Sequence, residues 1–177
     1  MAEWRAQLKK LTACGNKLPQ PFAFFHARPP SGQAWPEGVP SSPTLRELYT
    51  LCDGGRFSRL YAWLPQERLI YATEEWAVTY QQFEDDFDEG DDPFDSGRHV
   101  VLTTEDETGG PLVWDATTDQ LAIFGCDPDG GFGWEPVHKG LESFLQTLFS
   151  PPPNSIYAKW DTDWVSAMQH LEKEHQG

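Results

Sequence analysis

The sequence predicts an α+β fold with an antiparallel sheet. Two observations carry this prediction: helix and strand patterns follow one another in the order helix, strands, helix, strands, helices, and the strand candidates are short and joined by turn-forming residues. The length of 177 residues fits one domain, and an aromatic content of 14% supplies large buried areas for a core. We therefore expect residues 1–177 to form a single domain.

Residues 1–42 predict a helix followed by a proline-rich arm. The face of a short helix over residues 2–11 carries Trp4, Leu8 and Leu11. Residues 18–43 contain seven prolines, which remove hydrogen-bond donors and block helix formation, so we expect an extended arm there. The apolar patch at residues 22–25 should dock on the core.

A second helix is predicted to begin at Pro43, because Ser42 can cap its first turn and proline is tolerated at the first helical position. One face of this helix carries Leu45, Leu48, Tyr49 and Cys52. Gly54 and Gly55 should stop it, since glycine suits the left-handed position after a helix.

Two strand candidates follow, at residues 57–64 and 68–71. Thr73 is then placed to cap a third helix, and Glu74 and Glu75 fall favourably in its first turn. The apolar face of that helix would carry Trp76, Tyr80 and Phe83.

An acidic segment at residues 84–95 comes next, with eight acids in twelve residues. Such a run carries more than half of the net charge of −15 and cannot pack as a core element. We therefore expect a mobile, solvated loop.

The remainder of the chain predicts a sheet followed by helices. The strand candidates are residues 99–103, 111–115 and 121–124, the last two joined as a hairpin, with a loop at residues 127–131. The helix candidate at residues 141–148 carries Leu141, Phe144, Leu145 and Leu148 on one face. Asp161 or Thr162 can cap a final helix that carries Trp164, Met168 and Leu171.

Charge and composition exclude several classes of function. With 28 acidic against 13 basic residues and no basic cluster longer than Lys9-Lys10, the chain lacks the basic stripe of nucleic-acid and anionic-membrane binders. No apolar stretch approaches the length of a membrane span, and residues 1–10 have no apolar signal region, so a cytoplasmic location is expected. Cys14, Cys52 and Cys126 show neither zinc-site spacing nor a disulfide framework.

No motif in the sequence indicates catalysis, and we expect no catalytic residue, no metal site and no cofactor. The serines lie outside any GxSxG elbow, and the Gly-Gly pairs lack the spacing of a phosphate loop. The Asp127 segment resembles the start of a calcium loop, but its twelfth position is His138 rather than a bidentate glutamate. Carboxylates within residues 84–95 share one solvated run, where solvent levels the pKa differences that an acid–base pair needs.

Four segments in order resemble the SUKH superfamily, which includes a yeast cell-wall-synthesis regulator and many bacterial immunity proteins. They are the helix exit Pro-Thr-Leu-Arg-Glu-Leu-Tyr-Thr-Leu-Cys-Asp-Gly-Gly at residues 43–55, the hairpin from 100–102 to 110–115, the strand at 121–124 followed by Asp127, and the helix at 140–148. Thr103-Thr104 and the long acidic insert depart from the pattern of the family. The resemblance implies a twisted antiparallel sheet with flanking helices over residues 43–149, with residues 150–177 as a C-terminal helical extension.

The resemblance also implies a non-enzymatic function, in which a cytoplasmic immunity protein binds and neutralises a toxin, often a nuclease or deaminase. An acidic protein agrees with this because a nuclease presents a basic cleft that an acidic surface can occupy. The predicted contact residues are Asp85, Asp86, Asp88, Glu89, Asp91, Asp92, Asp95 and Trp134. Trp134 is included because flanking glycines favour a partly exposed loop position, and tryptophan anchors interfaces well.

Two alternatives stay open from the sequence. One is a regulatory or scaffold module that binds a cellular protein without inhibiting an enzyme. The other is an enzyme or metal-binding protein that uses the carboxylates of residues 84–95.

Overall fold

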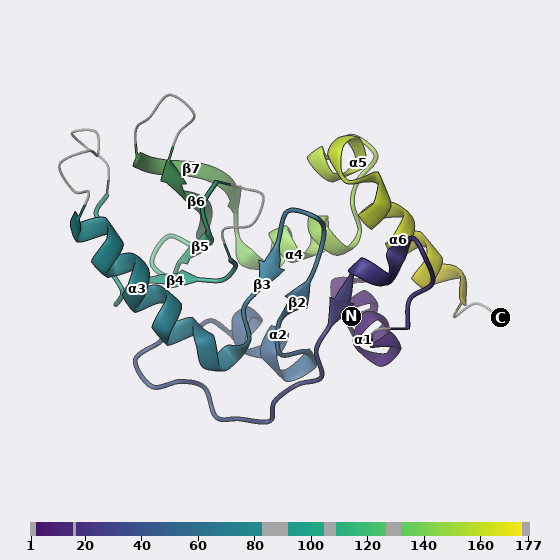
Figure 1. Cartoon of the computed structure of the whole chain (residues 1–177), viewed down its shortest axis with the longest axis horizontal. Helices are drawn as coiled ribbons and strands as arrows, with labels where there is room; N and C mark the ends of the chain where they lie inside the picture. The colour runs from purple at the N-terminus through teal and green to yellow at the C-terminus, as the bar shows by residue number, and fades with distance from the viewer. Residues whose placement is uncertain (1–2, 16, 83–91, 105–108, 127–131, 175–177) are drawn as a thin grey trace.

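The computed structural model describes residues 3–15, 17–82, 92–104, 109–126 and 132–174, and these form helices and two antiparallel sheets. The predicted α+β class is therefore confirmed. A four-stranded sheet lies at one end of the molecule and helices α1 and α6 lie at the other, with α4 and a three-stranded sheet between them (Figure 1).

Six α-helices and two short 3-10 turns lie in the described part of the chain. The helices are α1 (Glu3–Cys14), α2 (Pro43–Leu51), α3 (Leu69–Gln82), α4 (Leu141–Phe149), α5 (Ile156–Trp160) and α6 (Thr162–Glu174), and the turns are η1 (Phe22–Phe24) and η2 (Gln66–Arg68). All five predicted helices are present, whereas α5 was not predicted. The prediction of a strand at residues 68–71 is wrong, because α3 already begins at Leu69.

The residues predicted to begin the helices perform that role in two cases and not in a third. The Ser42 hydroxyl accepts a hydrogen bond from the Leu45 amide at 3.1 Å, and Asp161 accepts one from the Trp164 amide at 3.2 Å, so both caps are confirmed. Thr73 is not a cap. It lies inside α3, where its buried hydroxyl accepts from the Val101 amide at 3.1 Å and fixes the helix to the sheet.

The end of α2 differs from the prediction. Cys52 leaves the helix in an extended conformation, so no left-handed glycine caps it. Gly54 and Gly55 do have positive φ angles of 73° and 146°, but they serve the sheet instead. A Cβ atom on Gly54 would collide with the Leu64 backbone, and one on Gly55 would collide with the His26 backbone, so only glycine fits between the neighbouring strands.

The strands form two antiparallel sheets with sequential order. The small sheet is β1 (His26–Ala27), β2 (Gly55–Arg56) and β3 (Ala62–Trp63), and the large sheet is β4 (His99–Val101), β5 (Leu112–Asp115), β6 (Gln120–Cys126) and β7 (Phe132–Lys139). The prediction of one strand over residues 57–64 is wrong, because the Phe57 amide bonds to the Tyr61 carbonyl and turns the chain back from β2 into β3.

Strand β7 was not predicted, and the segment around Trp134 is therefore a strand rather than a loop. β7 is an edge strand that contains Gly133 and Pro136, two residues that are depleted in strand interiors. Proline is tolerated at a sheet edge, where its missing donor leaves no ladder bond unmade. The pairing of β7 with β6 is irregular at Leu121 and Ala122.

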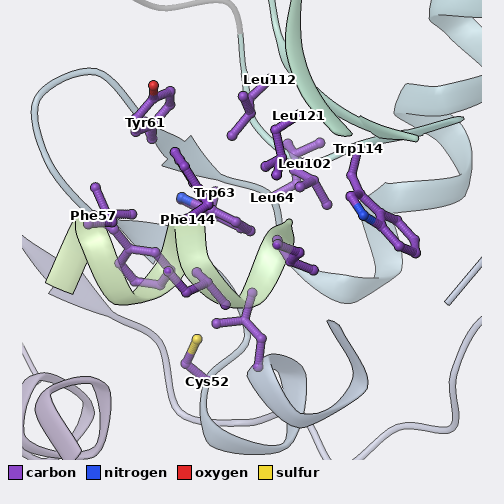
Figure 2. Packing of buried hydrophobic residues seen from close by; sticks show 14 of the residues in the cluster. Cys52, Phe57, Tyr61, Trp63, Leu64, Leu102, Leu112, Trp114, Leu121 and Phe144 are labelled. Carbon is purple, nitrogen blue, oxygen red and sulfur yellow. The ribbon is translucent and has the colours of Figure 1, made fainter. Parts of the chain in front are cut away.

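The core lies between the large sheet, α4 and the turn that joins β2 to β3. Figure 2 shows side chains of the large sheet above α4, with the aromatic residues of the turn beside them. Phe144 of α4 lies 5.6 Å from the Tyr61 ring and 6.4 Å from the Trp63 ring. The predicted docking of residues 22–25 is confirmed for Phe25, whose ring lies 5.1 Å from Trp164.

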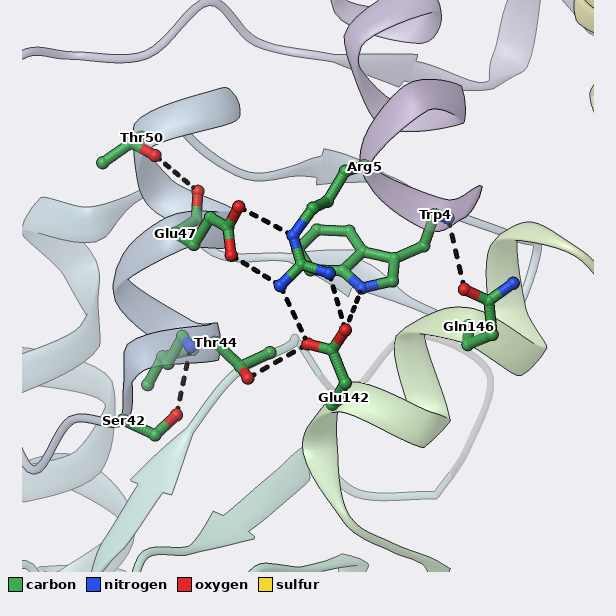
Figure 3. Close-up of polar contacts among 9 residues, drawn as sticks. Trp4, Arg5, Ser42, Thr44, Glu47, Thr50, Glu142 and Gln146 are labelled. Carbon is green, nitrogen blue, oxygen red and sulfur yellow. Dashed lines mark hydrogen bonds and ion pairs between the residues drawn. The ribbon is translucent and has the colours of Figure 1, made fainter. Parts of the chain in front are cut away.

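A network of charged and polar side chains joins α1 to α2 and α4 (Figure 3). The Arg5 guanidinium donates to Glu47 at 2.7 Å and to Glu142 at 2.6 Å. Glu142 also accepts from the Trp4 indole at 3.0 Å and from the Thr44 hydroxyl at 3.1 Å. Burial opposes ionisation of Glu142, but the bonds from Arg5, Trp4 and Thr44 outweigh it and hold its pKa below the ordinary value.

We expect Arg5→Ala to lower the free energy of unfolding by about 1–3 kcal/mol, because it removes charged hydrogen bonds to two other helices. Lys9→Ala is the matched control, since Lys9 is an exposed residue of the same helix, and it should change stability by less than about 0.5 kcal/mol. Urea denaturation measures both. Equal effects of the two substitutions would show that α1 is held by its apolar face alone.

Candidate functional site

A pocket of about 430 Å³ lies on the face of the large sheet that is opposite to α4. Side chains alternate between the two faces of a strand, so Leu112, Trp114 and Leu121 face the core whereas their neighbours face the pocket. The pocket is lined by Asp92, Arg98, His99, Val113, Asp115, Thr118, Gln120, Ala122, Trp134 and Pro136.

Strand register arranges these residues in two rows across the sheet. His99 pairs with Asp115, which pairs with Gln120, and this row is polar. The second row contains Val113, Ala122 and Pro136, paired in the same way on β5, β6 and β7, and it is apolar. The pocket therefore has one polar side and one apolar side.

Asp115 ends β5 and organises the turn into β6. Its carboxylate accepts from the Thr117 amide at 2.7 Å and from the Thr118 hydroxyl at 2.7 Å. It also accepts two bonds from Arg98, at 2.9 Å from Nε and 2.6 Å from Nη2. Burial opposes its ionisation, but the bonds from Arg98, Thr118 and Thr117 hold the pKa of Asp115 well below the ordinary value.

Arg98 connects the end of the acidic segment to the sheet. Its Nη2 lies 3.0 Å from the Asp92 carboxylate as well as 2.6 Å from Asp115, so one guanidinium bridges two acids. The Arg98 and His99 amides both donate to the Asp95 carbonyl, and the Gly97 amide donates to the Asp95 carboxylate. Together these bonds define the turn at residues 95–99.

Trp134 forms an aromatic wall of the pocket beside this turn, and two phenylalanine rings pack against it. The Trp134 indole donates to the Asp92 carbonyl at 2.7 Å and lies parallel to the Phe94 ring, with an interplanar angle of 3° and centroids 5.9 Å apart. The centroid of the Phe124 ring, on β6, lies 4.4 Å from that of Trp134 and 5.2 Å from that of Phe94. Asp92 and Trp134 therefore lie on the same rim.

The imidazole of His99 is buried against this wall, 4.8 Å from the Trp134 ring. Its Nδ1 accepts a hydrogen bond from the Asp95 amide at 2.9 Å, which places the proton of the neutral ring on Nε2. Burial, the largest influence, lowers the pKa of His99, so the ring is neutral at pH 7.

The structure brings together three of the residues predicted to bind a partner: Asp92, Asp95 and Trp134. The predicted residues Asp85, Asp86, Asp88, Glu89 and Asp91 lie outside the described residues. The expectation that the acidic segment does not pack is wrong for its end, because Phe94 is only 7% exposed and belongs to the core. The prediction considered only the charges of residues 84–95 and overlooked the apolar Phe94 among them.

The pocket also contains four residues that were not predicted as site residues: Arg98, His99, Asp115 and Thr118. Two local signals were available. Asp115 ends a strand and is followed by Ala-Thr-Thr, and an aspartate at such a position is typical of a turn in which the carboxylate accepts backbone amides. Arg98 is the first basic residue after the acidic run, and thus a natural counter-ion for it.

In the described part of the chain, no group of three or more histidine, cysteine, aspartate or glutamate side chains could hold a metal ion. None of the helices in those residues is both long and apolar enough to cross a membrane. Cys52 is a buried free thiol, and burial raises its pKa to about 12.

We expect Asp115→Asn to lower the free energy of unfolding by about 2–3 kcal/mol at pH 7, because it removes a charged pair and weakens the turn. The pKa of Asp115 is lowered on folding, so its stabilising contribution is present above the ordinary value of 3.8 and is lost as the pH falls further. The difference between wild type and variant should therefore shrink between pH 5 and about pH 2.

Asp92→Asn is the control for this titration, since the Asp92 side chain is 67% exposed and, among the described residues, pairs with Arg98 alone. Its effect at pH 7 should be below about 1 kcal/mol. Urea denaturation at each pH measures all three proteins. A difference between wild type and Asp115→Asn that does not change with pH would contradict the assignment of an ionised Asp115.

Comparisons with protein-family models, curated proteins and solved structures found no match for this chain. The SUKH resemblance therefore stays a prediction.

Proposed function

We propose that this chain is a non-enzymatic binding protein that neutralises a basic toxin domain of the nuclease or deaminase type, as a cytoplasmic immunity protein does. The observation that carries the proposal is the meeting of Asp92 and Trp134 on the rim of one pocket, at the end of the acidic segment. A negative charge and an aromatic side chain that can anchor a partner therefore lie at one place.

The charge of the chain supports a basic partner. The net charge is −15, and residues 84–95 contribute eight acids to it. A nucleic-acid enzyme must present a basic cleft to phosphates, and an acidic protein surface complements that cleft. Long-range attraction of this kind mainly accelerates association.

The geometry of the pocket supports a specific contact. Arg98 and Asp115 hold the turn at residues 95–99 against the sheet before any partner arrives, so little ordering remains to be done on binding. Trp134 is half-buried among aromatic rings, which keeps its orientation fixed. Rigid tryptophans at a pocket rim are typical of the residues that dominate binding energy.

A regulatory or scaffold module is the second candidate, and one observation favours it. Trp160 is 78% exposed and Ile156 is 56% exposed, both on α5. In Figure 1 this helix lies at the opposite side of the molecule from α3 and the large sheet. A partner bound there would leave the pocket open, and it would contact an apolar surface rather than an acidic one.

The proposal predicts electrostatically steered association with the basic toxin domain. Changing Asp85, Asp86 and Asp88 to Asn should reduce the association rate about tenfold at 0.1 M salt, and the difference should vanish near 1 M salt. These three are chosen because Asp92 and Asp95 also hold the turn at residues 95–99 together. Stopped-flow mixing measures the rates.

The matched control is Glu37, Glu67 and Glu75 changed to Gln, which removes the same formal charge from exposed positions elsewhere. This control should retain at least half of the wild-type rate. Equal slowing by both triple variants would assign the effect to net charge alone. Failure of the wild-type chain to bind and inhibit the toxin domain would reject the proposed function.

A further inference from the structure

One hydrogen-bond donor inside the pocket has no partner among the residues that the structure describes. His99 is 3% exposed, and its Nδ1 already accepts from Asp95. Its Nε2 carries the proton and forms no hydrogen bond to the described residues. His99 lines the pocket, so a group bound there can accept from this N–H.

We infer that the pocket receives a tyrosine side chain of the partner protein, with its hydroxyl oxygen on the Nε2–H of His99. The inference rests on the proposed function, because it takes the occupant to be part of a protein partner. To the proposed function it adds the type of partner residue that enters the pocket and the atom of this chain that binds it.

The hydrogen-bonding inventory selects against the charged side chains. Arginine and lysine have donors but no acceptor, so neither can satisfy the His99 donor, and both would meet the guanidinium of Arg98. A carboxylate could accept, but the lining charges of Asp92, Asp115 and Arg98 sum to an excess of negative charge. A phenol oxygen is a neutral acceptor, so it can satisfy the His99 donor without bringing a further charge into the pocket.

The phenol also fits the rest of the lining. Its hydroxyl hydrogen has an acceptor available in the Asp92 carboxylate, which is 67% exposed and uses only Oδ2 in its pair with Arg98. Its ring has Val113, Ala122 and Pro136 as an apolar side and Trp134 as an aromatic wall. A volume of about 430 Å³ accommodates a tyrosine with its flanking backbone.

The test uses the ¹⁵N-labelled full chain and four probes: N-acetyltyrosinamide, N-acetylphenylalaninamide, N-acetylargininamide and acetate. We expect the tyrosine probe to shift the Trp134 indole and His99 imidazole resonances saturably. It should bind at least about fivefold tighter than the phenylalanine probe, which lacks only the hydroxyl. The indole resonance of Trp160 is the internal control and should not move.

A His99→Phe variant keeps an aromatic ring beside Trp134 and removes the donor, so it should bind the two aromatic probes equally. The comparison of probes on the wild-type chain stands even if this variant does not fold. Tighter binding of the arginine probe or of acetate at Trp134 would overturn the inference. So would the absence of a saturable shift with the tyrosine probe at its solubility limit.

A separate assay of toxin inhibition distinguishes the inference about tyrosine from the proposed function. If the chain inhibits the toxin while the tyrosine probe fails, the inference about tyrosine is wrong and the proposed function stands. If the tyrosine probe binds while no basic toxin is bound, the proposed function fails and the preference of the pocket remains.

Discussion

The ion pair between Arg98 and Asp115 is the contact on which the candidate site depends. It fixes the turn at residues 95–99 to the end of β5, and the same guanidinium holds Asp92. The Asp115 side chain is only 12% exposed, so removal of one partner would leave a largely buried charge. The geometry that this pair fixes places Asp92 beside Trp134.

Much of the fold could be predicted because the signals of a helix, its capping residues and its apolar face, lie within a short stretch of sequence. Ser42 and Pro43 begin α2, and the apolar face of α4 is complete within nine residues. Elements whose conformation depends on tertiary contacts were missed. Strand β7 exists because β6 supplies its partner, although Gly133 and Pro136 argue against a strand locally.

The candidate site was predictable only in part, for a related reason. Acidic charge and a tryptophan flanked by glycines can be found in the sequence, and these led to Asp92, Asp95 and Trp134. His99 acquires its role from strand register, which pairs it with Asp115, and from the turn that occupies its Nδ1. Neither relation is visible without the sheet.

If the chain neutralises a toxin as proposed, the pocket face of the large sheet, and not α5, contacts the toxin domain. Hydroxyl-radical footprinting of the free and toxin-bound chain tests it directly, because Trp134 marks the pocket and the exposed Trp160 marks α5. We expect binding to reduce oxidation of Trp134 severalfold and to leave oxidation of Trp160 unchanged. Protection of Trp160 with unchanged oxidation of Trp134 would contradict it.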